Sequence, residues 1–260
     1  MNLSSALALL LATLFSLSIC DAPAKAEPTA LIARVADWPP ASWQEKGQWQ
    51  GMNVDFYQAL AKESGLPLRF VDLPWSRALA SLKSGECTIM AELSKTAERE
   101  KAMHFLGPYA GEEMVLVVRA EDREVPIGNL QQLITQSRAR GLQVGIERDA
   151  SYGDEFNLRL EKDPGFQASF TFARSTLAEM MNNRRLFAFV EQRHIAAHKI
   201  RHQPEFAGLA IHPFIVSSAP LYFAVSRSVD EKTLASLQRA TETLIANGTF
   251  AAIDRKWQKY

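Results

Sequence analysis

Short apolar segments alternate with helical patterns along most of the chain, and this alternation occurs twice. Apolar runs such as Leu31–Ala36 and Leu68–Leu73 are typical of buried strands, and each precedes a stretch with apolar residues three and four positions apart. The polar stretch Ala120–Val125 interrupts the pattern, which starts again at Gln143–Ile146. Such alternation is typical of α/β proteins with mostly parallel sheets flanked by helices. The interruption predicts two such units in one chain.

The same patterns place the individual elements. Strands are expected at Leu31–Ala36, Leu68–Leu73, Cys87–Ala91, Met114–Arg119, Gln143–Ile146, Ser169–Phe172, Phe187–Val190 and Leu221–Val225. Helices are expected at Val54–Ser64, Ser76–Lys83, Thr96–Met103, Tyr152–Leu160, Leu177–Asn183, Arg193–Arg201, Leu234–Ala246 and Phe250–Trp257. Gly248 supplies the left-handed residue that separates the last two helices.

The first 26 residues have the features of an export signal. The apolar run Leu7–Leu17 is shorter than the roughly 20 residues that a membrane-spanning helix needs, and Ala24-Lys25-Ala26 offers a small-x-small cleavage site. We therefore expect a signal peptide at residues 1–26 and a periplasmic protein. Cys20 follows the apolar run and offers lipidation as an alternative, which the bulky Ile19 disfavours.

Composition narrows the classes of function. The chain has 29 basic and 29 acidic residues, and this balance argues against nucleic acid as a partner. If Cys20 is removed with the signal, Cys87 is the single remaining thiol, so no intrachain disulfide is expected. A lone Cys87 is expected to be buried like a small apolar residue. The mature chain is expected to be a soluble monomer.

Five short motifs follow one another at characteristic spacings. They are Gly51–Asp55, Pro74–Leu79, Thr96–Arg99, Phe105–Tyr109 and the C-terminal run Asn247–Trp257. In this order they resemble the bacterial extracellular solute-binding proteins of family 3, over nearly all of the chain that follows the signal. The resemblance implies a two-lobed periplasmic binding protein fold, in which each lobe is a mostly parallel sheet flanked by helices.

The resemblance also implies how the lobes are divided and what they do. The chain would cross twice between them, near Val118–Glu121 and Ser217–Tyr222, so that residues 27–118 and 222–260 form lobe 1 and residues 119–221 form lobe 2. The cleft would capture a small carboxylate-bearing solute, with an amino acid as the expected class, and deliver it to an inner-membrane transporter. A module that presents its ligand to a sensor is the alternative.

Three residues of the first lobe are the leading ligand-binding candidates. Arg99 corresponds to the family arginine that holds the ligand's carboxylate, and a planar guanidinium matches a carboxylate with two parallel hydrogen bonds. Trp38 and Trp75 stand where the family places aromatic walls, and an indole face can cover an apolar, aromatic or cationic group. As alternatives, Arg99 would be a surface residue paired with its neighbours and both tryptophans would be core residues.

Two more candidates follow the third expected strand. Ser94 can donate a hydroxyl to a ligand, and Glu92 brings a carboxylate to a place where the family often has a small polar residue. Glu92 is expected either to receive a ligand ammonium or to point into solvent, as lone carboxylates commonly do.

The second lobe departs further from the family pattern. Ser151 is expected to cap the following helix and to present its amides to an anionic group. Asp149 stands where the family has a permissive glycine, and it would repel a carboxylate. Glu191 is the candidate partner for the ligand's amino group, although strict alignment places Gln192 there.

Two other functions compete with solute binding. His194, His198 and His202 recur every four residues, a spacing that can place two imidazoles on one helical face for a metal. Eight residues rotate by about 80° around a helix, so the three do not converge, and a solvated basic face is expected instead. A dehydratase acting on a bound carboxylic acid would need a general acid, for which Glu92 or Glu191 could serve. We expect no enzymatic activity, no cofactor and no metal.

Overall fold

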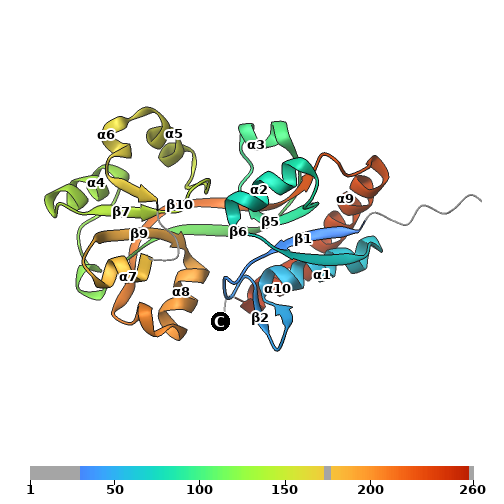
Figure 1. Ribbon diagram of the computed structural model, residues 1–260, viewed down its shortest axis with the longest axis horizontal. Helices are drawn as coiled ribbons and strands as arrows, with labels where there is room; N and C mark the ends of the chain where they lie inside the picture. The colour runs from blue at the N-terminus through green and yellow to red at the C-terminus, as the bar shows by residue number, and fades with distance from the viewer. Residues whose placement is uncertain (1–29, 173–176, 258–260) are drawn as a thin grey trace, which may run out of the picture.

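The computed structural model describes residues 30–172 and 177–257. The expected signal peptide and Cys20 therefore lie outside the described residues. Within them, the molecule is elongated and has two lobes joined by a pair of long strands (Figure 1). The strands form an eight-stranded sheet in the order β4-β1-β5-β10-β6-β9-β7-β8. Strands β4, β1 and β5 pair in parallel, as do β9, β7 and β8. The long strands β6 and β10 pair antiparallel with each other and with their neighbours β9 and β5. The predicted two-lobed α/β fold is confirmed.

Each lobe has its own strands and helices. Lobe 1 contains β1 (Leu31–Val35), β2 (Trp43–Glu45), β3 (Gln48–Gln50), α1 (Met52–Ser64), β4 (Leu68–Asp72), α2 (Trp75–Ser84), β5 (Ile89–Leu93), α3 (Ala97–Ala102), α9 (Glu231–Ala246) and α10 (Thr249–Trp257). Lobe 2 contains η1 (Ala120–Asp122), α4 (Leu130–Ala139), β7 (Gln143–Ile146), α5 (Asp154–Lys162), α6 (Pro164–Gln167), β8 (Phe170–Phe172), α7 (Leu177–Asn182), β9 (Leu186–Gln192), α8 (Arg193–His202) and η2 (Pro204–Phe206). The joining strands are β6 (Met103–Arg119) and β10 (Leu209–Ser226).

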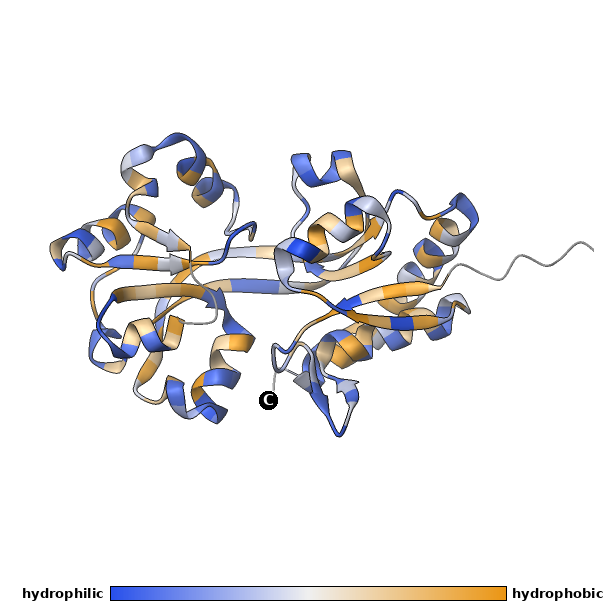
Figure 2. Ribbon diagram, viewed as in Figure 1, coloured by the Kyte–Doolittle hydropathy of each residue, from blue (hydrophilic) through white to orange (hydrophobic). Residues whose placement is uncertain are grey.

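Separate apolar cores lie on the two sides of the sheet in each lobe. Hydrophobic residues, coloured orange in Figure 2, are concentrated on the strands and recur along the helices. In lobe 1, Tyr109 stacks on Phe223 with ring centroids 4.0 Å apart, and Phe250 from the last helix packs beside both. In lobe 2, Phe156 and Phe166 pack edge to face at 5.2 Å. The C-terminal helices thus belong to the core of lobe 1, as the resemblance implied.

The long strands begin earlier than the sequence predicts. The apolar patterns at Met114–Arg119 and Leu221–Val225 mark only the last residues of β6 and β10. The earlier parts of both strands contain a mixture of glycine, proline, serine and glutamate residues, which breaks the apolar run. Ladder hydrogen bonds between the two strands hold this stretch, so it needs no continuous apolar face.

Strand pairing also bears on where the chain crosses between the lobes. Met114–Val118, which the sequence prediction assigned to lobe 1, pair with β9 of lobe 2. In β10, Pro220 faces Gly111 and Leu221 faces Ala110, whereas Tyr222 onward pairs with β5 of lobe 1. We therefore propose that both crossings lie where residues 110–114 face residues 217–221, and that lobe 1 ends there.

Three further differences concern local elements. Helix α4 was not predicted, although Asn129 caps it by accepting from the Gln132 amide and its apolar side chains recur with helical spacing. Strand β5 lies two residues later than expected. The hairpin of β2 and β3 was also missed, because its strands are only three residues long and largely exposed. Among the described residues, we find no helix with the length and hydropathy that crossing a membrane requires.

Candidate functional site

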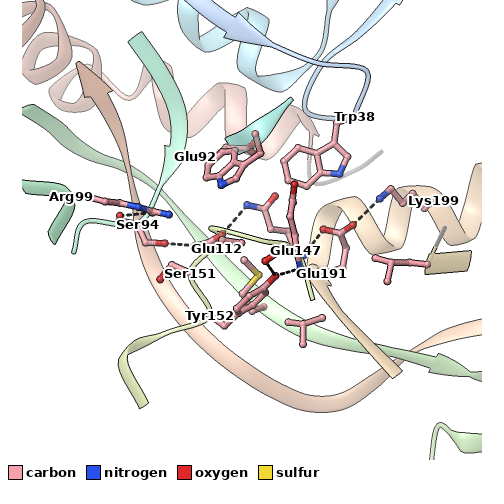
Figure 3. Close-up of a pocket in the computed structure, with 16 residues that line it drawn as sticks. Trp38, Glu92, Ser94, Arg99, Glu112, Glu147, Ser151, Tyr152, Glu191 and Lys199 are labelled. Atoms are coloured by element: carbon pink, nitrogen blue, oxygen red, sulfur yellow. Dashed lines mark hydrogen bonds and ion pairs between the residues drawn. The ribbon is translucent and has the colours of Figure 1, made fainter. Parts of the chain in front are cut away.

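A cavity lies between the two lobes, and all seven predicted ligand-binding residues line it (Figure 3). The space between these side chains, its opening to solvent included, is about 660 Å³. The predicted residues on its walls are Trp38, Trp75, Glu92, Ser94, Arg99, Ser151 and Glu191. Their side chains come from both lobes, so a molecule held here would touch both.

The strand ends explain why these side chains meet. Glu92 lies near the carboxyl end of β5, Glu147 directly follows β7, and Glu191 lies at the end of β9. In open α/β sheets the carboxyl ends of parallel strands border the ligand crevice. Here the two lobes place these ends face to face across the cavity. The sequence positions are far apart, and topology alone brings them together.

Glu92 is the most deeply buried of the predicted polar residues. Its side chain is 1% exposed, so the alternative that it points into solvent is wrong. Oε2 accepts from Asn53 Nδ2 at 2.9 Å, whereas Oε1 accepts no hydrogen bond from the described residues. The backbone is left-handed with φ 60°, and the Glu92 amide donates to the Tyr109 hydroxyl at 2.8 Å. Buried tyrosine therefore fixes a backbone conformation that non-glycine residues rarely adopt.

Arg99 reaches both lobes from the first turn of α3. Its Nη1 donates to the Ser94 carbonyl at 3.0 Å, and its Nη2 donates across the cleft to the Asp149 carbonyl at 3.0 Å. Thr96 caps the helix by accepting from the Arg99 amide. Burial lowers the pKa of the Arg99 guanidinium, and the nearby Glu112 carboxylate opposes that shift. The group remains a cation, as arginine does in proteins.

Asp149 closes the cleft on the side of Trp75. The Trp75 indole N–H donates to the Asp149 carbonyl at 3.2 Å, and the Ser76 hydroxyl donates to the Asp149 carboxylate at 2.6 Å. Asp149 has φ 63°, the left-handed conformation for which the family glycine would be suited. It is not among the residues that line the cavity. Asp149 was expected to repel a ligand carboxylate. In the structure it instead makes contacts between the lobes, outside the cavity lining.

Trp38 makes a second contact between the lobes. It is 9% exposed and packs with Ala41 of its own loop and with Ile195 of α8. The Trp38 amide donates to the Ser42 carbonyl at 2.7 Å, which holds the loop after β1 in place. Trp38 is thus both a packing residue and a wall of the cavity, so its two predicted alternatives are not exclusive.

Ser151 has a different local role from the one predicted. Helix α5 begins at Asp154, and Gly153 occupies its N-cap without a side-chain hydrogen bond. The Ser151 hydroxyl accepts from Asn157 Nδ2 at 2.8 Å. The prediction that Ser151 caps this helix is therefore wrong, because a left-handed glycine two residues later starts it. Ser151 still lines the cavity.

Both Glu191 and Gln192 line the cavity, although sequence reasoning treated them as alternatives. Glu191 is paired within lobe 2, since Lys199 Nζ lies 2.7 Å from its Oε2. Gln192 Nε2 donates to Glu112 Oε2 at 2.8 Å. An ammonium reaching Glu191 would therefore meet a carboxylate that already has a cation beside it.

Four polar residues of the site were not predicted: Glu112, Glu147, Tyr152 and Lys199. Glu112 lies in the crossing part of β6 and is 6% exposed. Burial raises the pKa of its carboxyl, while hydrogen bonds from Gln192 and Ser94 act in the opposite direction. Glu112 and Glu113 directly precede the apolar run that was predicted as a strand. Extending that strand backward over both glutamates would have placed Glu112 in β6. Lys199 lies two turns into α8, among the histidines for which a solvated basic face was expected.

Of the histidines of α8, His202 is exposed, as a solvated face requires, whereas His194 and His198 are half-buried. His194 Nε2 lies 3.4 Å from Glu92 Oε1 across the cleft, and the His194 side chain is 21% exposed. The His198 and His202 rings lie 4.6 Å apart, and burial lowers the pKa of His198. Among the residues with described positions, no group of three or more His, Cys, Asp or Glu side chains is arranged to hold a metal ion.

Comparison with known proteins agrees with this architecture. Over 228 residues the chain is 21% identical to the arginine-binding extracellular protein ArtP of Bacillus subtilis, covering 87% of this chain and 85% of that protein. A mutant of ArgBP from T. maritima superposes with a TM-score of 0.71 at 22% identity, covering 89% and 95% of the two chains. A histidine kinase sensor domain similar to periplasmic binding proteins superposes with a TM-score of 0.72 at 20% identity, covering 89% and 96%.

The family assignment rests on a match over most of the sequence. The two structural similarities establish the fold alone, because the sequence identities of 22% and 20% are too low to carry function. The profile that describes the bacterial extracellular solute-binding proteins of family 3 matches residues 31–260. This range includes both lobes and both joining strands, and it contains every residue of the cavity. The resemblance seen in the five motifs is confirmed: the chain belongs to the bacterial extracellular solute-binding proteins, family 3.

Proposed function

We propose that this solute-binding protein captures an amino acid in the cavity between its lobes, in the periplasm, and delivers it to an inner-membrane transporter. The observation that carries the proposal is the position of Arg99. Its guanidinium lines the cavity and is held by one carbonyl from each lobe. These bonds use two of the five N–H donors of an arginine side chain. The remaining donors suit a ligand carboxylate, which arginine recognises in bidentate fashion.

Closure follows from the same geometry. Arg99, Trp75 and Ser76 of lobe 1 all donate to Asp149 of lobe 2. A ligand held between Arg99 and the lobe 2 wall adds contacts that exist only when the lobes are together. Because a ligand shifts a conformational equilibrium only by its differential affinity, binding would favour the closed arrangement. The closed form would then be recognised by the transporter.

Several observations support an amino acid as the ligand class. The cavity is lined by a guanidinium, which suits a carboxylate, by carboxylates, which suit an ammonium, and by two tryptophans. ArtP, a relative along most of the chain, is an arginine-binding protein. The histidine kinase sensor domain with the same fold keeps the sensory role as a second candidate. In either role the ligand leaves unchanged, so we expect no product after prolonged incubation.

A thermal unfolding panel tests the proposal. A ligand at about 100 times its dissociation constant adds about 2.7 kcal/mol to the free energy of unfolding. For a chain of this size the midpoint would rise by roughly 5–10 °C. We expect such a shift with at least one of the twenty amino acids and its loss in Arg99→Lys, because an ammonium cannot reproduce the bidentate fork.

Arg69→Lys is the matched control. Arg69 lies on the edge strand β4, is exposed and does not line the cavity, so this variant should keep the full shift. Mass spectrometry of the bound ligand distinguishes binding from turnover. If no amino acid stabilises the protein, or if Arg99→Lys leaves the shift intact, the proposed carboxylate site is wrong.

A further inference from the structure

The first turn of α8 forms a contact between the lobes that is separate from the Asp149 contacts. Asp149 meets Trp75 and Ser76 of α2, on one face of the joining strands, whereas α8 lies on the other face, on the side of α10 (Figure 1). Ile195 of this turn is buried and packs with Trp38 of lobe 1. Closure therefore brings the start of α8 against lobe 1.

His194 of the same turn meets Glu92 of lobe 1. His194 Nε2 lies 3.4 Å from Glu92 Oε1, and the two side chains are 21% and 1% exposed. Both atoms are buried, and neither has a hydrogen-bond partner within the described part of the chain. An ordinary N–H···O hydrogen bond is about 2.9 Å long, so a shift of about half an ångström would satisfy both atoms. Buried polar groups are unfavourable without such a bond.

Lobe 1 holds Glu92 in a fixed position for this contact. Its Oε2 accepts from Asn53 Nδ2 at 2.9 Å, and its amide donates to the Tyr109 hydroxyl at 2.8 Å. Its backbone has φ 60°, and residues held in this left-handed conformation concentrate at functional sites. Lobe 1 thus satisfies one carboxylate oxygen and leaves Oε1 to a donor from the other lobe.

Carboxylates of three elements interact with His194: Glu92 of β5, Glu112 of β6 and Asp254 of α10. Burial raises the pKa of the Glu112 and Asp254 carboxyls, and His194 acts against both shifts. An ionised carboxylate accepts hydrogen bonds and donates none, so Glu92 favours the forms of the imidazole that carry a proton on Nε2. The surroundings of His194 therefore suit a donor directed at Glu92.

We propose that His194 is a positioning residue for ligand capture. When the lobes close on a ligand, His194 Nε2 donates to Glu92 Oε1 and retains the closed arrangement. The inference rests on the proposed function, since it assumes that an amino acid draws the lobes together. An interaction made only in the closed form raises the population of that form without touching the ligand. Because the ligand enters before the lobes meet, the His194–Glu92 contact governs dissociation and leaves association nearly unchanged.

Stopped-flow kinetics of His194 variants test the contact. Each of the twenty L-amino acids is titrated into the wild-type protein, and the one that binds most tightly is the probe for all variants. His194→Met removes the donor, and we expect its dissociation rate constant to rise about tenfold or more, with the association rate constant changed less than about threefold. His194→Gln provides an amide donor at a similar distance from the backbone and should stay within about threefold of the wild type.

His202→Met is the matched control, because His202 is an exposed histidine at the end of the same helix. This variant should keep the wild-type dissociation rate. A double-mutant cycle then assigns the effect to the pair: once Glu92→Met has removed the acceptor, adding His194→Met should change the rate less than about twofold. Circular dichroism checks the folding of each variant. The comparison of His194→Met with His194→Gln needs no change at Glu92 and decides the proposal if Glu92→Met does not fold.

The possible failures separate the two proposals. If His194→Met dissociates at the wild-type rate, or if His194→Gln is impaired as much as His194→Met, the positioning role of His194 is overturned while the amino-acid function stands. An effect of His194→Met that is equally large with and without the Glu92 carboxylate would overturn the pairing with Glu92. If no amino acid binds to the wild-type protein, the proposed function fails and the role of His194 in capture fails with it.

Discussion

The two lobes each bring a glutamate to the cavity in a similar way. Glu92 of lobe 1 and Glu147 of lobe 2 lie at the carboxyl ends of parallel strands. In each case the glutamate amide donates to a buried tyrosine hydroxyl, Tyr109 at 2.8 Å in lobe 1 and Tyr152 at 2.6 Å in lobe 2. Two unrelated stretches of sequence thus use the same device to fix the end of a strand.

The difference lies in what holds each tyrosine. Tyr109 is on the joining strand β6, 17 residues beyond Glu92, and it is stacked on Phe223 in the core of lobe 1. Tyr152 is only five residues beyond Glu147 and also donates back to the Glu147 carbonyl at 3.1 Å. The lobe 1 glutamate is therefore fixed by the core, whereas the lobe 2 glutamate is fixed within its own loop. The lobe 1 part of the cavity wall is thus anchored in a core, and the lobe 2 part is anchored in a loop.

Removing the two hydroxyls should have unequal effects on stability. Tyr109→Phe leaves the buried Glu92 amide without an acceptor, and we expect a loss of about 1–3 kcal/mol in the free energy of unfolding. Tyr152→Phe should lose less than about 1 kcal/mol, because Glu147 is only half-buried and water can replace the hydroxyl. Urea unfolding measures both.

Tyr222→Phe serves as the control for these variants. Tyr222 is partly exposed and packs edge to face on Phe105. This substitution should change stability by no more than a few tenths of a kcal/mol. Equal losses in Tyr109→Phe and Tyr152→Phe would remove the distinction between a site fixed by the core and a site fixed by its loop.

Sequence reasoning reached the lobe 1 wall more completely than the lobe 2 wall. Arg99 and Trp75 lie in short motifs at the starts of helices, and Trp38 closely follows the first strand, so local patterns locate all three. The fold was predictable for the same reason, since alternating strands and helices leave periodic apolar patterns.

The residues that were missed depend on contacts between distant segments. Glu112 lies in a strand whose crossing part has no apolar periodicity, and its burial arises only where β6 meets β9 and β10. Lys199 faces the cavity because Glu191, eight residues earlier, stands at the end of the preceding strand. The charge of Asp149 suggested repulsion of a ligand carboxylate. Its backbone carbonyl instead accepts hydrogen bonds from Trp75 and Arg99 across the cleft. No local pattern encodes these relations.

Glu112 lies between the two lobes. Its protonation is expected to have the next largest effect on the free energy of unfolding. Burial raises its pKa above the ordinary value of 4.5 and the Glu92 charge adds to this, whereas Gln192, Ser94 and His194 oppose it. The folded state then binds this proton more tightly than the unfolded state. The contribution to stability is complete below pH 4.5 and is lost as pH rises through the folded pKa, by about 1.4 kcal/mol for each unit of upward shift.

Glu112→Gln should remove this part of the pH dependence of unfolding. The Gln192 Oε1 has no hydrogen-bond partner within the described part of the chain, so its amide can turn over and accept from the new side chain. We expect the variant to be more stable than the wild type at pH 7 and equal to it near pH 4. Urea unfolding at a series of pH values measures the difference. Parallel curves for the two proteins would contradict a raised pKa at Glu112.

The smallest predicted effect concerns closure of the lobe 2 loop. The Ser76 hydroxyl donates to the Asp149 carboxylate between two exposed residues, outside the cavity lining. Ser76→Ala should therefore weaken ligand binding only about two- to fivefold, chiefly through faster dissociation, because an exposed hydrogen bond contributes about 1 kcal/mol or less. Ser84→Ala, in the same helix but bonded within it, should leave the dissociation rate unchanged.

Asp149→Gly sharpens this test, because it removes the carboxylate but retains the carbonyl that accepts from Arg99 and Trp75. Glycine also adopts φ 63° without strain, so the loop geometry should persist. We expect the same modest weakening as in Ser76→Ala, and no further loss when the two are combined, since they remove one interaction. Stopped-flow dissociation measures all three. A much larger loss in Asp149→Gly would mean that the carboxylate orders the loop itself, and the lobe 2 wall would then be as pre-formed as that of lobe 1.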